Sequence, residues 1–149
     1  MSDISFVRGP VPQGQYMAAT VHDSIAYSAG MTPRIDGVLQ VSGVVGEAVD
    51  ITDAATAAGM CARNALTAIA SVAGGMDRVE RCLRMTVYVA CADNFFDLSA
   101  VADGASAVIA EILGGEALPV RAAIGVKNLP SGAPVEVDIT AVVDMKPHA

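Results

Sequence analysis

Apolar residues alternate most regularly in residues 135–143, near the C-terminal end of the chain. The apolar positions of this run are Val135, Val137, Ile139, Ala141 and Val143. A period of two among β-branched residues predicts a strand that buries one face. The preceding run, residues 119–126, is apolar except for Arg121, and the Pro, Ser and Gly residues of 129–134 favour a turn. The two runs therefore predict a β-hairpin with Arg121 on its first strand and Glu136 on its second.

Shorter strands are predicted in the first part of the chain. Residues 16–21 and 25–30 have a strand-like composition and flank a turn at residues 22–24, so they predict a hairpin. The Asp-Gly dipeptide at residues 36–37 is a tight-turn signal, and residues 39–41 after it predict a further short strand.

Residues 79–90 fit two interpretations. Arg78, Arg81 and Arg84 recur every three residues, as on one face of a helix, whereas residues 86–89 are mostly β-branched or aromatic. We predict a strand, because the composition of residues 86–89 is strongly typical of strands.

Two Ala-rich segments have the three- and four-residue spacing of helices. The first spans residues 53–72, follows the capping residues Asp50 and Thr52, and is ended by glycines at 74–75. The second is predicted to begin at the capping residue Asn94 and to be ended by glycines at 114–115. A face of alanines lets a helix lie close to a sheet, so we interpret both stripes as packing surfaces.

The predicted order of elements is strands, helix, strand, helix, two strands. This order predicts one α+β domain over residues 1–149, with both helices on one face of a mixed sheet. No further helix is predicted to cover the other face, so second and third copies of the chain are its expected cover. Hydrophobic residues make up 53% of the chain but aromatics only 4%, and burial by oligomerisation would supplement a core of such small side chains.

Charge and composition exclude several classes of partner. The net charge is −7 with nine Lys and Arg residues, so we expect neither nucleic acid nor an anionic membrane as a partner. No apolar run approaches the roughly 20 residues of a membrane span. Because no secretory signal is recognised, we expect a cytoplasmic protein with reduced core thiols at Cys61, Cys82 and Cys91. The two histidines, His22 and His148, are far apart in sequence, and we expect no metal site and no cofactor.

Arg121 is the candidate functional residue that the pattern itself identifies. Its guanidinium keeps its proton, so burial in an apolar strand requires an anionic partner. That partner is either a carboxylate of the protein or a ligand.

Several motifs resemble the Rid proteins, or reactive intermediate deaminases, also called the YjgF or L-PSP family. The runs that carry the resemblance are Pro-Val-Arg-Ala-Ala-Ile at 119–124, Val-Glu-Val at 135–137 and Gly-Gln-Tyr at 14–16. Runs at 61–66, 76–79 and 101–106 resemble a longer, less characterised subgroup of the family. The resemblance extends from Phe6 to Val143.

The resemblance implies a chorismate-mutase-like α+β fold and a homotrimer built around a central β-barrel, with ligand clefts between subunits. It implies hydrolysis of enamine or imine metabolites, such as 2-aminoacrylate, to a keto acid and ammonia, without cofactor or metal. Arg121 matches the arginine that holds the substrate carboxylate in two parallel bonds. Glu136 matches the glutamate that positions water and relays a proton, a role that burial would assist by raising its pKa.

The other implied site residues line the cleft. Tyr16 matches a tyrosine of its wall, Gly30 a backbone contact to the substrate, and Ala123 the position whose main-chain carbonyl holds the hydrolytic water. Ala29 and Met31 stand where the family usually has Ser and Gln, so the pocket loses a hydroxyl and becomes more apolar. A bulkier or less polar substrate would fit such a pocket.

Simpler interpretations of these residues remain open. Arg121 could form an internal ion pair, Glu136 could be a solvated residue on an outer face with Asp138 exposed beside it, and Tyr16 could be an edge residue. In the predicted hairpin Arg121 lies opposite residue 141, roughly 16 Å along the ladder from Glu136 at ~3.3 Å per residue. A neighbouring subunit would then be needed to complete the site.

Three functions are weighed for this sequence. The first is an enamine or imine deaminase, a hydrolase acting on C=N bonds. The second is a protein that binds small carboxylate metabolites without turnover, which the residues at 29 and 31 favour. A ribonuclease or translation inhibitor is disfavoured by the acidic charge.

Overall fold

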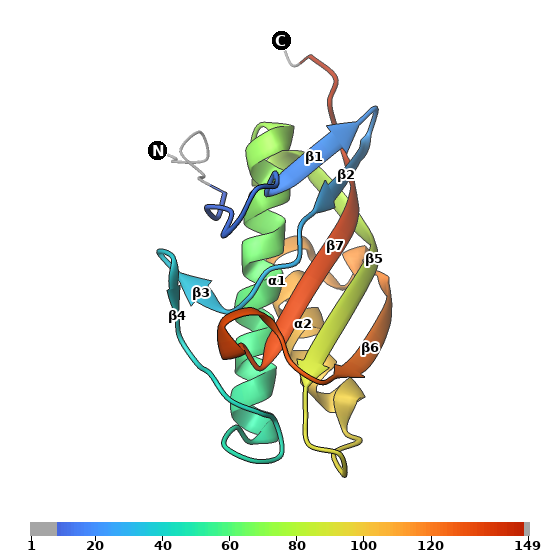
Figure 1. Ribbon diagram of the computed structural model, residues 1–149. Helices are drawn as coiled ribbons and strands as arrows, with labels where there is room; N and C mark the ends of the chain where they lie inside the picture. The colour runs from blue at the N-terminus through green and yellow to red at the C-terminus, as the bar shows by residue number, and fades with distance from the viewer. Residues whose placement is uncertain (1–8, 148–149) are drawn as a thin grey trace.

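The computed structural model describes residues 9–147 and has two layers, with both helices on the same face of the sheet (Figure 1). The start of the family resemblance at Phe6 and the tail residue His148 lie outside the described residues. The helices are α1 (Ile51–Ala73) and α2 (Leu98–Leu113). The strands are β1 (Ala19–His22), β2 (Ile25–Ser28), β3 (Arg34–Ile35), β4 (Val38–Leu39), β5 (Val79–Ala90), β6 (Val120–Val126) and β7 (Val135–Val143). Short 3₁₀ turns are η2 (Met76–Arg78), η3 (Gly115–Ala117) and η4 (Pro130–Gly132).

The main sheet has the strand order β1-β2-β7-β5-β6, so the predicted hairpin of β6 and β7 is wrong. β5 lies between these strands, parallel to β6 and antiparallel to β7. Met85 of β5 pairs with Arg121 on one side and with Ile139 on the other, so Arg121 does not face residue 141. The connection of β5 to β6 passes through α2, as parallel neighbours require, and the turn-like residues after β6 carry the chain past β5.

The other strand predictions are confirmed with shifted boundaries. β1 and β2 form the first hairpin, around a turn in which Asp23 has a positive φ of 55°. β3 and β4 flank Asp36 and Gly37, whose positive φ values of 52° and 81° suit the tight turn between them. Residues 79–90 form a strand and not a helix.

The two helix predictions differ in accuracy at their N-termini. In α1 the Asp50 carboxylate accepts a hydrogen bond from the Asp53 N–H at 2.8 Å, and Gly74 ends the helix with φ 99°. The prediction that Asn94 caps the second helix is wrong, because α2 begins at Leu98. Residues 92–95 form a turn instead, in which the Phe95 N–H donates to the Ala92 carbonyl at 3.0 Å.

The core lies between the helices and the sheet. Val135, Val137, Ile139, Ala141 and Val143 of β7 are buried on this side, whereas the even-numbered residues of β7 occupy the open face of the sheet. The helices approach closely at Gly104, where a Cβ atom would overlap the backbone of Ala55. Cys61 and Cys82 are buried in this core, and burial raises the pKa of the Cys82 thiol to about 12. Within residues 9–147 neither helix is long and apolar enough to cross a membrane.

Candidate functional site

Glu136 is a half-buried acid on the open face of β7. Burial raises the pKa of its carboxyl, and the nearby charge of Asp138 raises it further. Gly30 packs against this carboxyl, since a Cβ atom at Gly30 would lie 2.8 Å from its carboxylate carbon. The lack of a side chain at residue 30 is therefore what leaves room for Glu136.

A bulge in the sheet brings Gly30 to this place. Tyr27 pairs with Thr140, and the next paired residues are Met31 and Val137, so residues 28–30 face only residues 138–139. The Ser28 hydroxyl accepts a hydrogen bond from the Ile139 N–H at 3.0 Å, so a side chain replaces a backbone carbonyl where the β2–β7 pairing is interrupted. Bulges re-aim neighbouring residues, and this one aims the backbone of Gly30 at Glu136.

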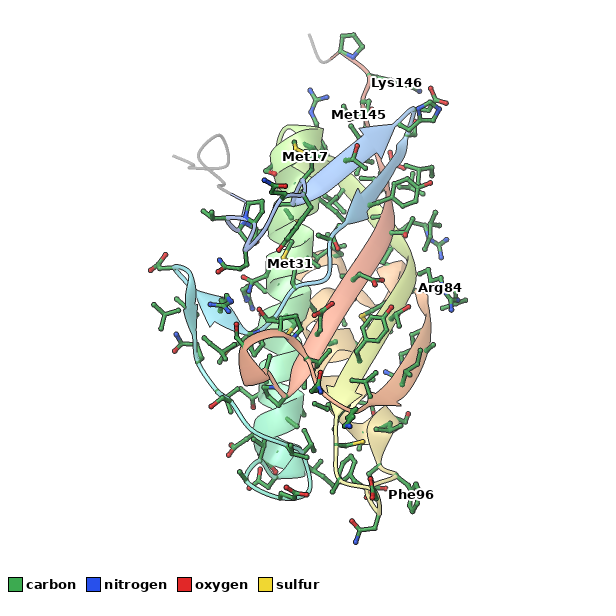
Figure 2. All side chains as sticks on the ribbon, in the orientation of Figure 1. Met17, Met31, Arg84, Phe96, Met145 and Lys146 are labelled. Carbon is green, nitrogen blue, oxygen red and sulfur yellow. The ribbon has the colours of Figure 1, made fainter. Side chains whose placement is uncertain are left out.

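Asp138 and Tyr88 lie beside Glu136 on the open face. Tyr88 pairs with Glu136 in the register of β5 and β7, and its hydroxyl donates to the Asp138 carboxylate at 3.4 Å. The prediction that Asp138 is exposed is wrong, because its side chain is partly buried. Burial raises the pKa of Asp138, although the hydrogen bond from Tyr88 and the charge of Arg84 oppose that shift. Figure 2 shows Arg84 extending from the edge of the sheet into solvent.

Tyr16, Ala29 and Met31 surround Gly30 from the N-terminal side. Tyr16 and Met31 line a cavity of about 30 Å³ together with Gly30. The Tyr16 hydroxyl accepts a hydrogen bond from the Gln13 N–H at 3.0 Å, and its ring is 47% exposed. The Ala29 N–H donates to the carbonyl of Ala18, just before β1, at 2.8 Å. The structure thus gathers Gly30, Ala29, Tyr16 and Glu136 in one region.

Arg121 lies in a different region, on the helix side of β6. Its guanidinium pairs with the Asp103 carboxylate at 2.8 Å and donates to the Ser106 hydroxyl at 2.8 Å and the Ser99 hydroxyl at 2.8 Å. The side chain of Arg121 is 22% exposed and that of Asp103 70%. The sequence allowed Arg121 either a carboxylate of the protein or a ligand as its anionic partner, and the structure shows the carboxylate of Asp103.

The sequence analysis missed Ser99, Asp103 and Ser106. They occupy positions i, i+4 and i+7 of α2, which places them on one face of the helix. Polar residues at this spacing in an otherwise apolar helix were a usable signal that the face meets a charged group. The run 101–106 had been recognised only as resembling a subgroup of the family.

Arg121 and Glu136 do not meet within one chain. Met85 of β5 pairs with both Arg121 and Ile139, so the three side chains lie on the same side of the sheet, toward the helices. Glu136 of β7 has the opposite parity to Ile139 and points to the open face. The two positions are three residues apart along the strands and two strands apart across the sheet. At about 3.3 Å per residue and about 4.8 Å per strand, their Cα atoms lie roughly 14 Å apart.

Ala123 shares the helix side of β6 with Arg121 and pairs with Val87. β6 is an edge strand, and Val120 and Ile124 on its open side are 67% and 42% exposed. Beyond its C-terminal end lies an open hollow of about 910 Å³, lined in part by Cys91, Phe96 and Lys127. Phe96 projects outward there, at the end of the molecule opposite Met145 and Lys146 (Figure 2). None of the predicted site residues lines this hollow.

Among residues 9–147, no group of three or more His, Cys, Asp or Glu side chains is placed to hold an ion.

Comparison with known proteins gives consistent matches over most of the chain. The family model described as "Endoribonuclease L-PSP" matches residues 7–143. Protein TCP17 of Trypanosoma cruzi is 32% identical over 128 residues, which are 85% of this chain and 80% of TCP17.

Solved structures share the fold. Atu1372 of Agrobacterium tumefaciens, a protein of unknown function, superposes with a TM-score of 0.83 at 33% identity, over 88% of this chain and 84% of that one. TdcF of E. coli, solved with bound serine, superposes with a TM-score of 0.68 at 18% identity, over 97% of this chain and 100% of TdcF. The second likeness concerns the fold alone.

Proposed function

Because the chain belongs to the endoribonuclease L-PSP family, also called the YjgF or Rid family, we propose that it hydrolyses reactive enamine or imine metabolites to a keto acid and ammonia. The observation that carries this proposal is the half-buried Glu136, whose carboxyl has a raised pKa and fits the space left by Gly30. A carboxyl with a raised pKa keeps its proton to a higher pH than an ordinary Glu does and can transfer it to a substrate.

The proposed reaction uses Glu136 for two proton movements. The enamine CH₂=C(NH₂)CO₂⁻ takes a proton at its terminal carbon and becomes an iminium, whose C=N carbon is attacked by water. The carbinolamine that forms transfers its hydroxyl proton to the nitrogen and loses ammonia, and the C–N bond electrons leave with nitrogen as the C=O bond forms. In this proposal Glu136 supplies the first proton and accepts one from the attacking water, the main-chain carbonyl of Ala123 orients that water, and Tyr16 closes the cleft.

Arg121 is proposed to hold the substrate carboxylate, and a second chain is proposed to bring it to Glu136. The opposite orientations of the two side chains and their roughly 14 Å separation support a shared site, because one small ligand cannot reach both in a single chain. The exposed edge of β6 next to Arg121 supports the same arrangement. We propose a homotrimer with three such clefts around a central barrel.

The direct test measures keto-acid release from 2-aminoacrylate generated in situ. Wild-type protein should accelerate the release, and Arg121→Ala should remove the acceleration. No acceleration by a folded wild-type protein would contradict the proposal.

A mixing experiment tests whether the cleft is shared. Arg121→Ala and Glu136→Gln are each expected to be inactive, but an equal mixture, unfolded and refolded together, should regain about one quarter of wild-type activity, since a quarter of the clefts receive both intact residues. A mixture as inactive as its components would show that both residues act from the same chain.

A second candidate function is the binding of small carboxylates without turnover. The Arg121–Asp103 ion pair favours it, because a cation that is already neutralised exchanges one carboxylate for another without chemistry. Ala29, which lacks the hydroxyl usual in the family, favours it too. Saturable binding of keto acids with no release of product from any imino acid would decide for it.

A further inference from the structure

Arg121 is held by three residues of α2, Ser99, Asp103 and Ser106, which we call the Arg121 cradle. Two of the three are uncharged hydroxyls, so Asp103 is the charged member. Its carboxylate uses the Oδ1 atom for Arg121 and is 70% exposed, so it stands at the rim where a ligand of Arg121 would enter. Any anion that reaches the guanidinium must therefore approach a fixed negative charge.

The position of Asp103 is set by close packing behind it. Gly104, the next residue, lies against the backbone of Ala55 in α1, where no Cβ atom would fit. α2 is thus held against α1, and the opposite face of α2 presents its polar residues to Arg121 in β6. The backbone that carries Asp103 is consequently held in place beside Arg121.

We propose that Asp103 is a specificity-determining residue that favours ligands with one carboxylate and a cationic or neutral nitrogen over ligands with additional negative charge. This inference rests on the proposed role of Arg121 as the carboxylate-binding residue. An iminium acid carries a positive nitrogen beside its carboxylate and is attracted by Asp103 as well as by Arg121. A keto acid carries only the negative charge and is repelled by Asp103, so the same residue favours substrate entry and product release.

The test compares ligands that differ in charge but not in size. Alanine and pyruvate share a three-carbon skeleton, and malonate of similar size has two carboxylates. Dissociation constants are measured by ligand-observed NMR at low ionic strength for wild type, Asp103→Asn and Arg121→Ala. The Asn side chain keeps the shape of Asp and its hydrogen-bond acceptor for Arg121 while removing the charge.

A matched control removes a similar charge from the same helix. Glu111 of α2 forms an exposed ion pair with Arg63 of α1 at 3.0 Å, away from the cradle. Glu111→Gln therefore changes the net charge of the protein by the same amount without touching Arg121. Its greater distance from Arg121 and its pairing with Arg63 limit its effect on ligands of Arg121.

The expected result is a change in selectivity and not a uniform change in affinity. Asp103→Asn should tighten pyruvate binding about 3- to 10-fold and malonate binding about 10-fold or more, while alanine binding changes by less than about twofold or weakens. Glu111→Gln should alter none of the three beyond about twofold, because Glu111 lies farther from Arg121. The rise in pyruvate affinity should shrink as salt is added.

Two outcomes overturn different statements. If Arg121→Ala abolishes binding but Asp103→Asn changes the dissociation constants of all three ligands by the same factor, Asp103 only positions Arg121 and the inference is wrong. If Arg121→Ala binds pyruvate as well as the wild type does, the proposed role of Arg121 fails first, and this inference fails with it.

Discussion

The regions around Arg121 and Glu136 differ in whether the neighbouring groups favour the charged form of the residue. Arg121 is surrounded by groups that stabilise its charged form, namely the Asp103 carboxylate and the hydroxyls of Ser99 and Ser106. Glu136 is half-buried beside another acid, Asp138, and both burial and that acid disfavour its charged form. One site is electrostatically complete within the chain and the other is not.

This difference separates a residue whose charge the chain itself stabilises from one whose protonation depends on its surroundings. A cation with three partners contributes a fixed positive charge whether or not a ligand is bound. An acid with a raised pKa changes its proton content when its surroundings change, which is the property that proton transfer requires. We therefore expect substitutions at the two regions to affect different measurements.

The largest effect is expected at Glu136. Glu136→Gln keeps the size of the side chain but cannot exchange a proton, so turnover should fall about 100-fold or more. Keto-acid release from 2-aminoacrylate measures it, and circular dichroism checks that the fold is retained. Asp138→Asn, next to it on the same face, is the matched control and should lose less than about tenfold. Equal losses in both variants would remove the distinction between the two acids.

The next effect perturbs the Arg121 region alone. Gly104→Ala should destabilise the protein by about 1–3 kcal/mol, because its Cβ would force α2 away from the backbone of Ala55. The midpoint of urea unfolding measures the change. Gly115→Ala, whose Cβ would meet nothing within 4 Å, is the control and should stay within about 0.5 kcal/mol of the wild type. A Gly104 variant as stable as this control would show that the helices adjust freely.

A smaller effect is expected where Gly30 meets Glu136. Gly30→Ala should displace the Glu136 carboxyl and lower kcat roughly tenfold, because misplaced catalytic groups lose rate without losing the ligand. Binding of pyruvate through Arg121 should stay within about twofold of the wild type. Steady-state kinetics and ligand titration on the same preparation separate the two quantities. Loss of binding with unchanged kcat would contradict the assignment of Gly30 to the Glu136 region.

The smallest effect is the pH dependence of stability. Glu136 and Asp138 have pKa values raised above 4.5 and 3.8, so the folded state binds more protons than the unfolded state at mildly acidic pH. Their contribution to stability is complete below those unfolded values and is lost as pH rises through the raised pKa values. Urea unfolding from about pH 4 to pH 7 should show this decline, and Glu136→Gln combined with Asp138→Asn should flatten it. An unchanged slope in the double variant would assign the decline to other groups.

Local sequence patterns predicted the elements well because their signals are local. Alternation in residues 135–143, the cap at Asp50 and the positive-φ turn at residues 36–37 each depend on residues close together in the chain. The confirmed α+β class, with both helices on one face of a mixed sheet, followed from the order of these elements. Tertiary contacts were needed for the start of α2, where the Ala92 N–H is engaged by the Val45 carbonyl at 2.9 Å.

Strand neighbours and site partners were harder to predict, because both depend on distant segments. Turn-like residues after β6 suit a hairpin as well as a longer connection, and nothing local indicated that β5 lies between β6 and β7. The same limit hid the partner of Arg121, since the rest of α2, η3 and the start of β6 separate Asp103 from Arg121 in the chain. The family resemblance supplied Glu136, Gly30 and Tyr16, but only the bulge between β2 and β7 shows why residue 30 is glycine.

The open edge of β6 affects how the protein must be handled. An unpaired strand edge that carries exposed Val120 and Ile124 is a template for unwanted strand addition. Copies whose β6 edge stays uncovered would be lost to fibrous or amorphous aggregates. We therefore expect the yield and shelf life of purified protein to depend on protein concentration more steeply than the activity of each intact molecule does.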